Sequence, residues 1–275
     1  MRCAWKELLG ILPPRLRPEV DRLGNTELQE LRLRINAPPE LVLGKGSRRL
    51  SWEVGRDDLN YCVNAASRYS PWTAATAAQG YITAPGGHRI GLCGEAVCRD
   101  GQVTGIRDIR SLCIRVARDF PGIAKIAAQT PGSILILGAP GWGKTTLLRD
   151  LIRCISEKET VSVVDERGEL FPEAFEQGKR MDVLTNCPKG LGINMVLRTM
   201  GPSCIALDEI TAEEDCYALV HAANCGVRLL ATAHAASLSD FRSRCVYHPL
   251  VEQKIFETLL ILRPDKSYRV ERMTL

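Results

Sequence analysis

The sequence predicts a two-domain protein whose larger part is an α/β domain built on a parallel sheet. Its 275 residues suffice for one large domain or two modest ones. The pattern changes near Thr130-Pro131-Gly132, and after this point short apolar strands alternate with helices. We therefore expect a smaller N-terminal α+β domain over residues 1–130 and the α/β domain over residues 131–275.

The composition narrows the class of protein further. Hydrophobic residues make up 45% and charged residues 25% of the chain, which excludes disordered, collagen-like and coiled-coil chains. The sequence contains no apolar run of the roughly 18 residues that a membrane-spanning helix needs. The short apolar run Leu8–Leu12 is cut by Pro13-Pro14 and is no better as a signal peptide. Eleven cysteines without a C-x-x-C pair argue against a disulfide framework or a zinc site, so we expect a cytosolic protein.

The net charge of +4 is unevenly distributed. Residues 1–130 contain 19 Lys and Arg against 13 Asp and Glu, whereas residues 131–275 contain 17 against 19. The N-terminal part could face a nucleic acid, a lipid surface or an acidic partner, or it could simply have an unevenly charged surface.

The N-terminal part shows mixed patterns. Glu27–Leu33 and Pro39–Leu43 look like short elements ahead of a loop at Gly44–Arg49. Helices are expected over Asp57–Ala66 and Pro71–Gln79. The apolar positions that recur at helical spacing in the first of these helices are Leu59, Cys62, Val63 and Ala66.

A glycine-rich stretch, residues 80–98, follows these helices. We expect a meander of short strands here, with one turn at Pro85-Gly86-Gly87 and the next at Asp100-Gly101. Beyond this stretch, apolar and polar residues alternate as in a half-buried strand. The apolar positions are Leu112, Ile114 and Val116.

The C-terminal part is expected to alternate strands with helices. The predicted strands are Ser133–Leu137, Thr160–Val164, Cys204–Leu207 and Val227–Thr232. Helices are predicted over Thr145–Ile155 and Ala212–Asn224, the second begun by a capping box at Thr211–Glu214 and stopped by Gly226. The end of the chain, Thr258–Leu262 and Tyr268–Met273, looks like a hairpin.

The segment Gly138–Thr145 matches the P-loop pattern G-x-x-x-x-G-K-[ST]. A predicted strand ends just before it and a predicted helix begins just after it. This context aims backbone N–H groups and the positive end of the helix at phosphate oxygens. The expected nucleotide-binding residues are Gly138, Ala139, Pro140, Gly141, Trp142, Gly143, Lys144, Thr145 and Thr146. Lys144 would supply a charge for the β- and γ-phosphates, and Thr145 would place its hydroxyl on Mg²⁺.

Carboxylates follow two of the predicted strands. Asp208 and Glu209 suit a Walker B element, in which Asp208 would join the Mg²⁺ shell and Glu209 would polarise the attacking water. Asp165 and Glu166 follow the strand after the P-loop helix, where either could orient water or metal. The sequence does not choose between this pair and Glu209 as the main activator.

Thr232 and His234 emerge together from an apolar strand. Such a pair indicates a sensor of the γ-phosphate, although a lone histidine is more often a satisfied structural residue. His234 therefore joins Asp165, Glu166 and Glu209 as a candidate catalytic residue.

These residues give the chain a resemblance to the stage III sporulation protein AA family of ATPases, which is related to the ATPases of type II and type IV secretion systems. The resemblance covers nearly the whole chain. The segments that carry it, besides the P-loop, are Gly80–Thr83, Gly87–Leu92, Val164–Arg167, Leu197–Met200, Asp208–Ile210 and Ala231–His234. The Gly-His-Arg segment is the most specific of these, because generic P-loop ATPases lack it.

The resemblance implies an α/β fold with a RecA-like P-loop core behind the N-terminal domain, ATP and Mg²⁺ as cofactors, ATP hydrolysis and assembly into hexamers. It also implies a place in the mother-cell cytoplasm, with membrane contact only through partners. Those partners would be the other proteins of the stage III channel complex between mother cell and forespore, which the ATPase would power or assemble. Arginines that could reach a nucleotide across subunits are Arg89, Arg107, Arg110 and Arg115.

Two other functions remain open from the sequence. A P-loop ATPase associated with nucleic acid would suit the basic N-terminal part, but no single-strand-binding module or aromatic stacking motif is visible. A scaffold that binds ATP in order to assemble, with little turnover, would use the same residues without needing Glu209.

Overall fold

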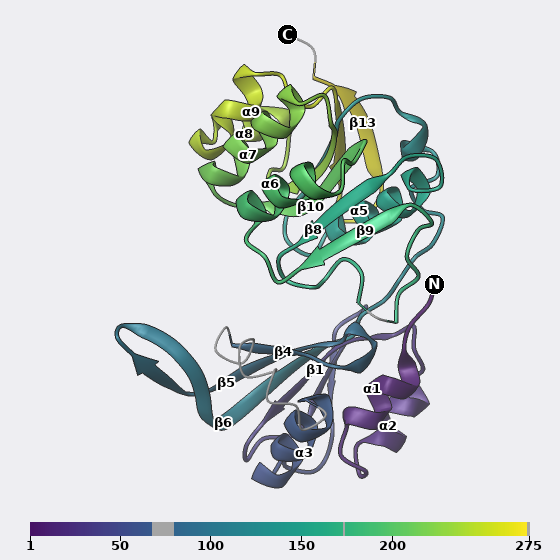
Figure 1. The fold of residues 1–275 in the computed structure, drawn as a ribbon. Helices are drawn as coiled ribbons and strands as arrows, with labels where there is room; N and C mark the ends of the chain where they lie inside the picture. Colours follow the sequence, from purple (N-terminus) through teal and green to yellow (C-terminus); the bar gives the residue numbers. More distant parts are fainter. Residues whose placement is uncertain (68–79, 173, 274–275) are drawn as a thin grey trace. The chain divides into compact units, whose positions relative to one another are not determined.

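The computed structural model describes residues 1–67, 80–172 and 174–273 (Figure 1). The chain divides into two compact units. One comprises Met1–Asp119 and Pro172–Phe175, and the other comprises Phe120–Phe171 and Glu176–Leu275.

The first unit is a sheet of six antiparallel strands with helices. Its helices are α1 (Trp5–Ile11), α2 (Arg17–Leu23) and α3 (Arg56–Ser67). Its strands are β1 (Leu28–Arg34), β2 (Glu40–Leu43), β3 (Ser47–Arg49), β4 (Tyr81–Thr83), β5 (Arg89–Arg99) and β6 (Gln102–Arg115), in the sheet order β3-β2-β1-β6-β5-β4. The expectation of a loop at Gly44–Arg49 was partly wrong, because β3 pairs with β2 there.

The expected meander of short strands over residues 80–98 is instead dominated by one long hairpin. Strands β5 and β6 contain 11 and 14 residues and pair with each other along most of their length (Figure 1). The predicted turn at Asp100-Gly101 is confirmed, and both residues have positive φ, at 50° and 76°. This combination matches the twist of paired strands. The predicted helix over Pro71–Gln79 lies outside the described residues.

The Gly-His-Arg segment has a structural role in this unit. The His88 side chain is fully buried, with Nε2 2.9 Å from the Ala4 carbonyl oxygen. The Ala117 N–H donates to Nδ1 over 3.1 Å, so the ring is neutral and carries its proton on Nε2. A Cβ at Gly86 would lie 2.5 Å from the Cβ of Ala4, which explains the need for glycine two residues before the histidine. The segment thus fixes the start of the chain against the sheet.

We expect acid to weaken this arrangement. Burial holds the pKa of His88 below its usual value of 6.5. The unfolded chain therefore binds the proton more readily, and the stability contributed by the neutral ring is lost as pH falls through 6.5. The amide of a His88→Gln variant can make both hydrogen bonds without titrating. In chemical unfolding between pH 7.5 and 5, the free energy of unfolding of the wild type should fall by up to about 1.4 kcal/mol per pH unit more than that of His88→Gln. Equal pH slopes for the two proteins would contradict this role.

The second unit is a seven-stranded sheet. Its strands are β7 (Ile134–Leu137), β8 (Val161–Asp165), β9 (Met181–Thr185), β10 (Cys204–Ile210), β11 (Arg228–Ala233), β12 (Thr258–Leu262) and β13 (Tyr268–Arg272), in the order β13-β12-β7-β11-β10-β8-β9. Only β13, at one edge, is antiparallel to its neighbour. The parallel sheet and the terminal hairpin are therefore confirmed.

Helices and apolar clusters complete the second unit. Its helices are α5 (Lys144–Ile155), α6 (Lys189–Thr199), α7 (Glu213–Asn224), α8 (Leu238–Ser243) and α9 (His248–Glu252). Alternate residues of β7 enter two separate apolar clusters. Leu135 and Leu137 pack with residues of α6 and α7, whereas Ile134 and Ile136 pack with residues of α5. The centre of the sheet is thus buried on both faces, which explains why β7 is continuously apolar.

The boundary at residue 130 stays a prediction. In the structure, residues 120–130 pack with the second unit. The Asp150 carboxylate on α5 accepts the backbone N–H groups of Gly122 and Ala124 at 3.0 and 2.8 Å.

The predicted capping box of α7 was wrong in its residues. The carboxylate that accepts the N–H groups of Thr211 and Ala212 belongs to Asp215, at 3.0 and 3.2 Å, rather than to Glu214. The helix consequently begins one residue later than predicted, at Glu213.

Within the described parts of the chain, none of the helices combines the length and hydrophobicity needed to cross a bilayer.

Candidate functional site

The loop between β7 and α5 has the backbone of an anion site. Gly141 and Gly143 adopt φ angles of 79° and 98°, which favour glycine. No side chain among the described residues caps the N-terminus of α5. The N–H groups of its first turn are therefore available to an anionic ligand, as the sequence pattern predicts.

The Lys144 side chain is folded back onto this loop. It is only 7% exposed, and its ammonium donates to the carbonyl oxygens of Gly138 and Ala139 at 2.9 and 3.2 Å. It also lies 3.0 Å from Nδ1 of His234. Burial lowers the pKa of Lys144, while the charges of Glu209 and Asp208 oppose this shift.

Asp208 joins two hydroxyl groups. Thr145 on α5 donates to one carboxylate oxygen, and Thr232 on β11 donates to the other, each over 2.7 Å. Hydroxyl and carboxylate oxygens are the ligands that Mg²⁺ prefers. The donor chemistry of Thr145 and Asp208 therefore fits the metal expected from the sequence.

Glu209 follows Asp208 in β10 and occupies a strained backbone position. Its φ of 50° lies in the left-handed region, and the pairing of β10 with β11 is irregular between Leu207 and Ile210. The Thr232 hydroxyl accepts the Glu209 N–H at 2.9 Å. One carboxylate oxygen lies 2.8 Å from Nε2 of His234, and the other lies 3.4 Å from the Arg167 guanidinium. The irregular strand thus points this carboxylate toward the neighbouring elements.

His234 connects the P-loop lysine with Glu209. An ammonium group can only donate, so Nδ1 of His234 must accept from Lys144. With one proton on the neutral ring, Nε2 then donates to Glu209. The histidine therefore contacts both the Lys144 ammonium and the Glu209 carboxylate.

The second acidic pair has different partners. Asp165 is 2% exposed, and its carboxylate accepts the N–H groups of Glu169 and Leu170 at 3.0 and 2.8 Å. Burial raises the pKa of Asp165 to about 6. The carboxylate of Glu166 lies 2.7 Å from the ammonium of Lys189. Asp165 thus holds the following loop, whereas Glu166 has a side-chain partner.

The structure brings six of the residues singled out from the sequence into one connected network. Its members are Lys144, Thr145, Asp208, Glu209, Thr232 and His234. Beside it, a small cavity is lined by Asp165, Glu166, Arg167, Glu169, Lys189, Asp208 and Glu209. Arg167 and Lys189 were not singled out from the sequence. No local signal identifies them, because their partners are distant along the chain.

The arginines considered for contact across subunits have partners within the first unit. Arg107 pairs with Glu95 at 2.5 Å, and Arg110 pairs with Asp108 at 3.2 Å. The Arg89 guanidinium lies 4.0 Å from the centre of the Tyr81 ring.

Comparisons with known proteins show the family to which the chain is similar. The model of the family described as Sporulation stage III, protein AA matches residues 6–271. Stage III sporulation protein AA of Bacillus subtilis (strain 168) is 35% identical over 282 residues, covering 95% of this chain and 92% of the relative. Protein SEEDLING PLASTID DEVELOPMENT 1 of Arabidopsis thaliana is 30% identical over 246 residues, covering 84% of this chain and 34% of that protein.

Solved ATPase structures share the fold. The ATPase DotB of Legionella pneumophila has a TM-score of 0.60 and 16% identity, covering 94% of this chain and 78% of DotB. DotB of Yersinia pseudotuberculosis has a TM-score of 0.62 and 15% identity, covering 95% of this chain and 80% of that protein. The pilus retraction motor PilT has a TM-score of 0.61 and 14% identity, covering 90% of this chain and 77% of PilT. They confirm the predicted fold class, a RecA-like P-loop core with a smaller N-terminal α+β part.

Proposed function

The chain belongs to the family Sporulation stage III, protein AA, and on that premise we propose that it is an ATP-hydrolysing motor of the secretion type. The motor would act in endospore formation, where it would power or assemble the channel complex between mother cell and forespore. The observation that carries the proposal is the hydrogen-bonded chain from Lys144 through His234 to Glu209.

The residues of the site suggest a division of tasks. The loop and first helical turn, residues 138–146, would bind the phosphates through N–H groups, with Lys144 adding charge. Thr145 and Asp208 would hold Mg²⁺, which neutralises charge that develops on the phosphate oxygens. Glu209 would accept a proton from the attacking water. Glu166 remains the better second candidate for orienting water, because backbone N–H groups occupy the Asp165 carboxylate.

The geometry also suggests how nucleotide would be sensed. The three N–H donors of Lys144 all have partners, namely two loop carbonyl oxygens and His234. To contact a phosphate oxygen, Lys144 must give up at least one of them. Loss of the His234 contact would free the ring that holds Glu209. Binding of nucleotide would thereby release the Glu209 carboxylate for its task.

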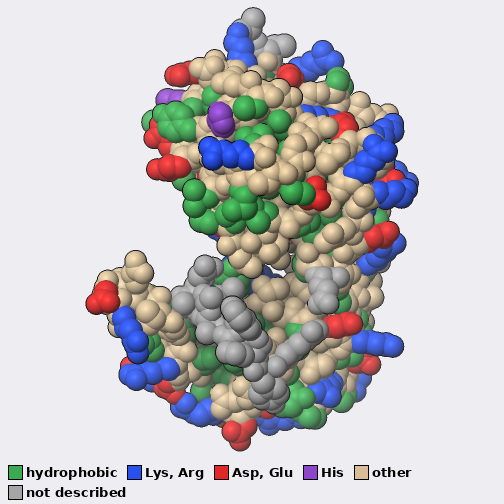
Figure 2. All heavy atoms as spheres, viewed as in Figure 1, with side chains coloured by type: hydrophobic (Ala, Val, Ile, Leu, Met, Phe, Trp, Pro, Cys, Tyr) green, Lys and Arg blue, Asp and Glu red, His purple; other side chains and the backbone are tan. Residues whose placement is uncertain are grey.

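The surface favours this proposal over an ATPase associated with nucleic acid. Several arginines of the first unit are paired with acids, which neutralises their charge locally. Such pairs are Arg32 with Glu30 and Arg34 with Glu40. On the face drawn in Figure 2, basic and acidic side chains of the described residues are interspersed.

Phosphate release from Mg²⁺-ATP tests the proposal. We expect the purified protein to hydrolyse ATP only with Mg²⁺, and to do so at the same rate with or without single-stranded DNA. Strong stimulation by DNA at low salt that is lost at high salt would contradict the motor and support nucleic-acid binding. We further propose a hexamer that reaches the membrane through other proteins of the channel complex.

A further inference from the structure

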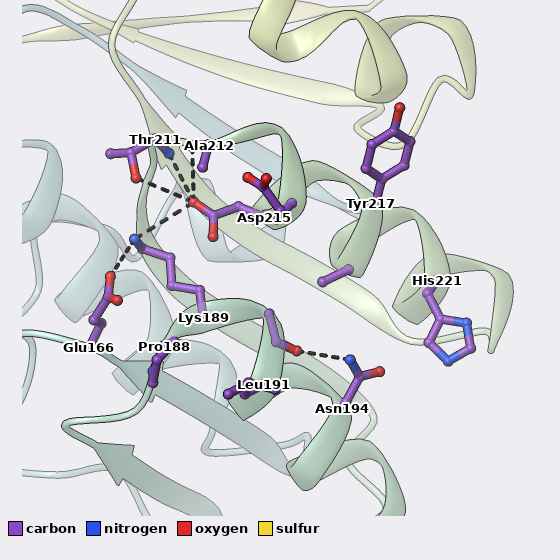
Figure 3. A pocket seen from close by; sticks show the side chains of 13 residues that line it. Glu166, Pro188, Lys189, Leu191, Asn194, Thr211, Ala212, Asp215, Tyr217 and His221 are labelled. Atoms are coloured by element: carbon purple, nitrogen blue, oxygen red, sulfur yellow. Dashed lines mark hydrogen bonds and ion pairs between the residues drawn. The ribbon is translucent and has the colours of Figure 1, made fainter.

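Lys189 is a buried cation that has no role in the proposed chemistry. It is the first residue of α6, and its side chain is 7% exposed. Its ammonium lies 2.7 Å from Glu166 and 3.7 Å from Asp215 (Figure 3). Burying an ammonium group costs free energy unless acidic partners compensate, so these contacts fix the place of the lysine.

The two acids belong to different elements beside the proposed catalytic network. Glu166 directly follows β8, next to Asp165. The Asp215 carboxylate holds the N–H groups of Thr211 and Ala212, in the short link between β10 and α7. Lys189 therefore connects the acidic end of β8 with the segment that follows Asp208 and Glu209.

The two acids depend on Lys189 to different degrees. Asp215 accepts two backbone N–H groups and would keep these bonds without the lysine. The Glu166 side chain is 37% exposed, and it lines a pocket of about 630 Å³ that Lys189 and Asp215 also line (Figure 3). Without the ammonium, water in this pocket could solvate a rotated Glu166 carboxylate. The position of Glu166 therefore depends on Lys189.

We propose that Lys189 is a positioning residue for ATP hydrolysis, which holds the Glu166 carboxylate at the cavity that Asp208 and Glu209 also line. This inference rests on the proposed ATPase function. Lys189 lies outside the P-loop and acts through Glu166, so it sets the rate of the chemical step and leaves nucleotide binding intact.

Steady-state hydrolysis by Lys189→Met tests the assignment. We expect kcat to fall roughly tenfold while KM for ATP changes less than about twofold, because the interaction serves the transition state. The matched control is Lys179→Met. It removes an ion pair of the same 2.7 Å length, formed with Glu157, in which the lysine is 78% exposed. This control should hydrolyse ATP at the wild-type rate.

A double-mutant cycle separates positioning from a merely structural role. If Lys189 acts through Glu166, Glu166→Gln should lower kcat by a similar factor, and the double variant should lose little more. Fully additive losses, or a raised KM with unchanged kcat, would overturn the assignment. Should Lys189→Met fail to fold, Glu166→Gln decides alone, because unchanged kcat in that variant contradicts the proposal. Absence of hydrolysis in the wild type would instead refute the ATPase function itself.

Discussion

Replacing Glu209 with glutamine is expected to lower kcat for ATP hydrolysis by about 10²–10⁴-fold, the contribution typical of a general base. Glutamine keeps the size of the side chain and an oxygen that can accept a hydrogen bond from Nε2–H of His234. The variant should therefore still fold and bind ATP. Steady-state phosphate release, together with retention of radiolabelled ATP on the isolated protein, measures both effects.

Two outcomes would contradict the proposed role of Glu209 or the need for hydrolysis. Hydrolysis by Glu209→Gln at the parental rate would move the activating role to Glu166 or Asp165. Normal spore formation with Glu209→Gln, but not with Lys144→Ala, would show that nucleotide binding suffices in the cell. The protein would then be an ATP-gated scaffold.

Lys144→Ala is expected to weaken ATP binding by at least roughly 100-fold, because it removes the charge-assisted bonds to the terminal phosphates. Hydrolysis should disappear with it. Titration with a fluorescent ATP analogue measures the affinity, and Lys179→Met serves as a control for loss of a surface lysine. An unchanged Kd in Lys144→Ala would mean that the loop is not the nucleotide site.

The sequence predicted those parts of the structure whose signals are local. The P-loop could be recognised because the glycine spacing, the preceding strand and the following helix all lie within about 20 residues. The buried strands β7, β8 and β11 could be predicted from runs that are largely apolar. Thr232, His234 and the acids near the end of β10 could be grouped because parallel strands end at one edge of a sheet.

Elements with weak local signals were missed. Strand β9 is only partly buried, so its apolar residues do not stand out. Helix α6 contains Gly190 and Gly192, which lower helix propensity. Gly192 is explained only by packing, because a Cβ there would lie 2.6 Å from the Val164 side chain. The helix depends on tertiary contacts that its own sequence does not reveal.

Side-chain partners distant along the chain could not be predicted either. Arg167 meets Glu209 across 42 residues, and Lys189 meets Glu166 across 23. Glu166 and Asp165 looked equivalent in the sequence, and they differ because the loop after β8 turns its N–H groups onto Asp165 while Glu166 pairs with Lys189. Such choices depend on how the loop folds.

The most direct test of the motor account is ATP hydrolysis per subunit measured against protein concentration, with the molecular mass determined in parallel with and without Mg²⁺-ATP. If the protein is a motor, turnover per subunit should rise as a ring assembles, because neighbouring subunits complete the site. A flat, near-zero rate at every concentration and mass, despite tight ATP binding, would contradict it.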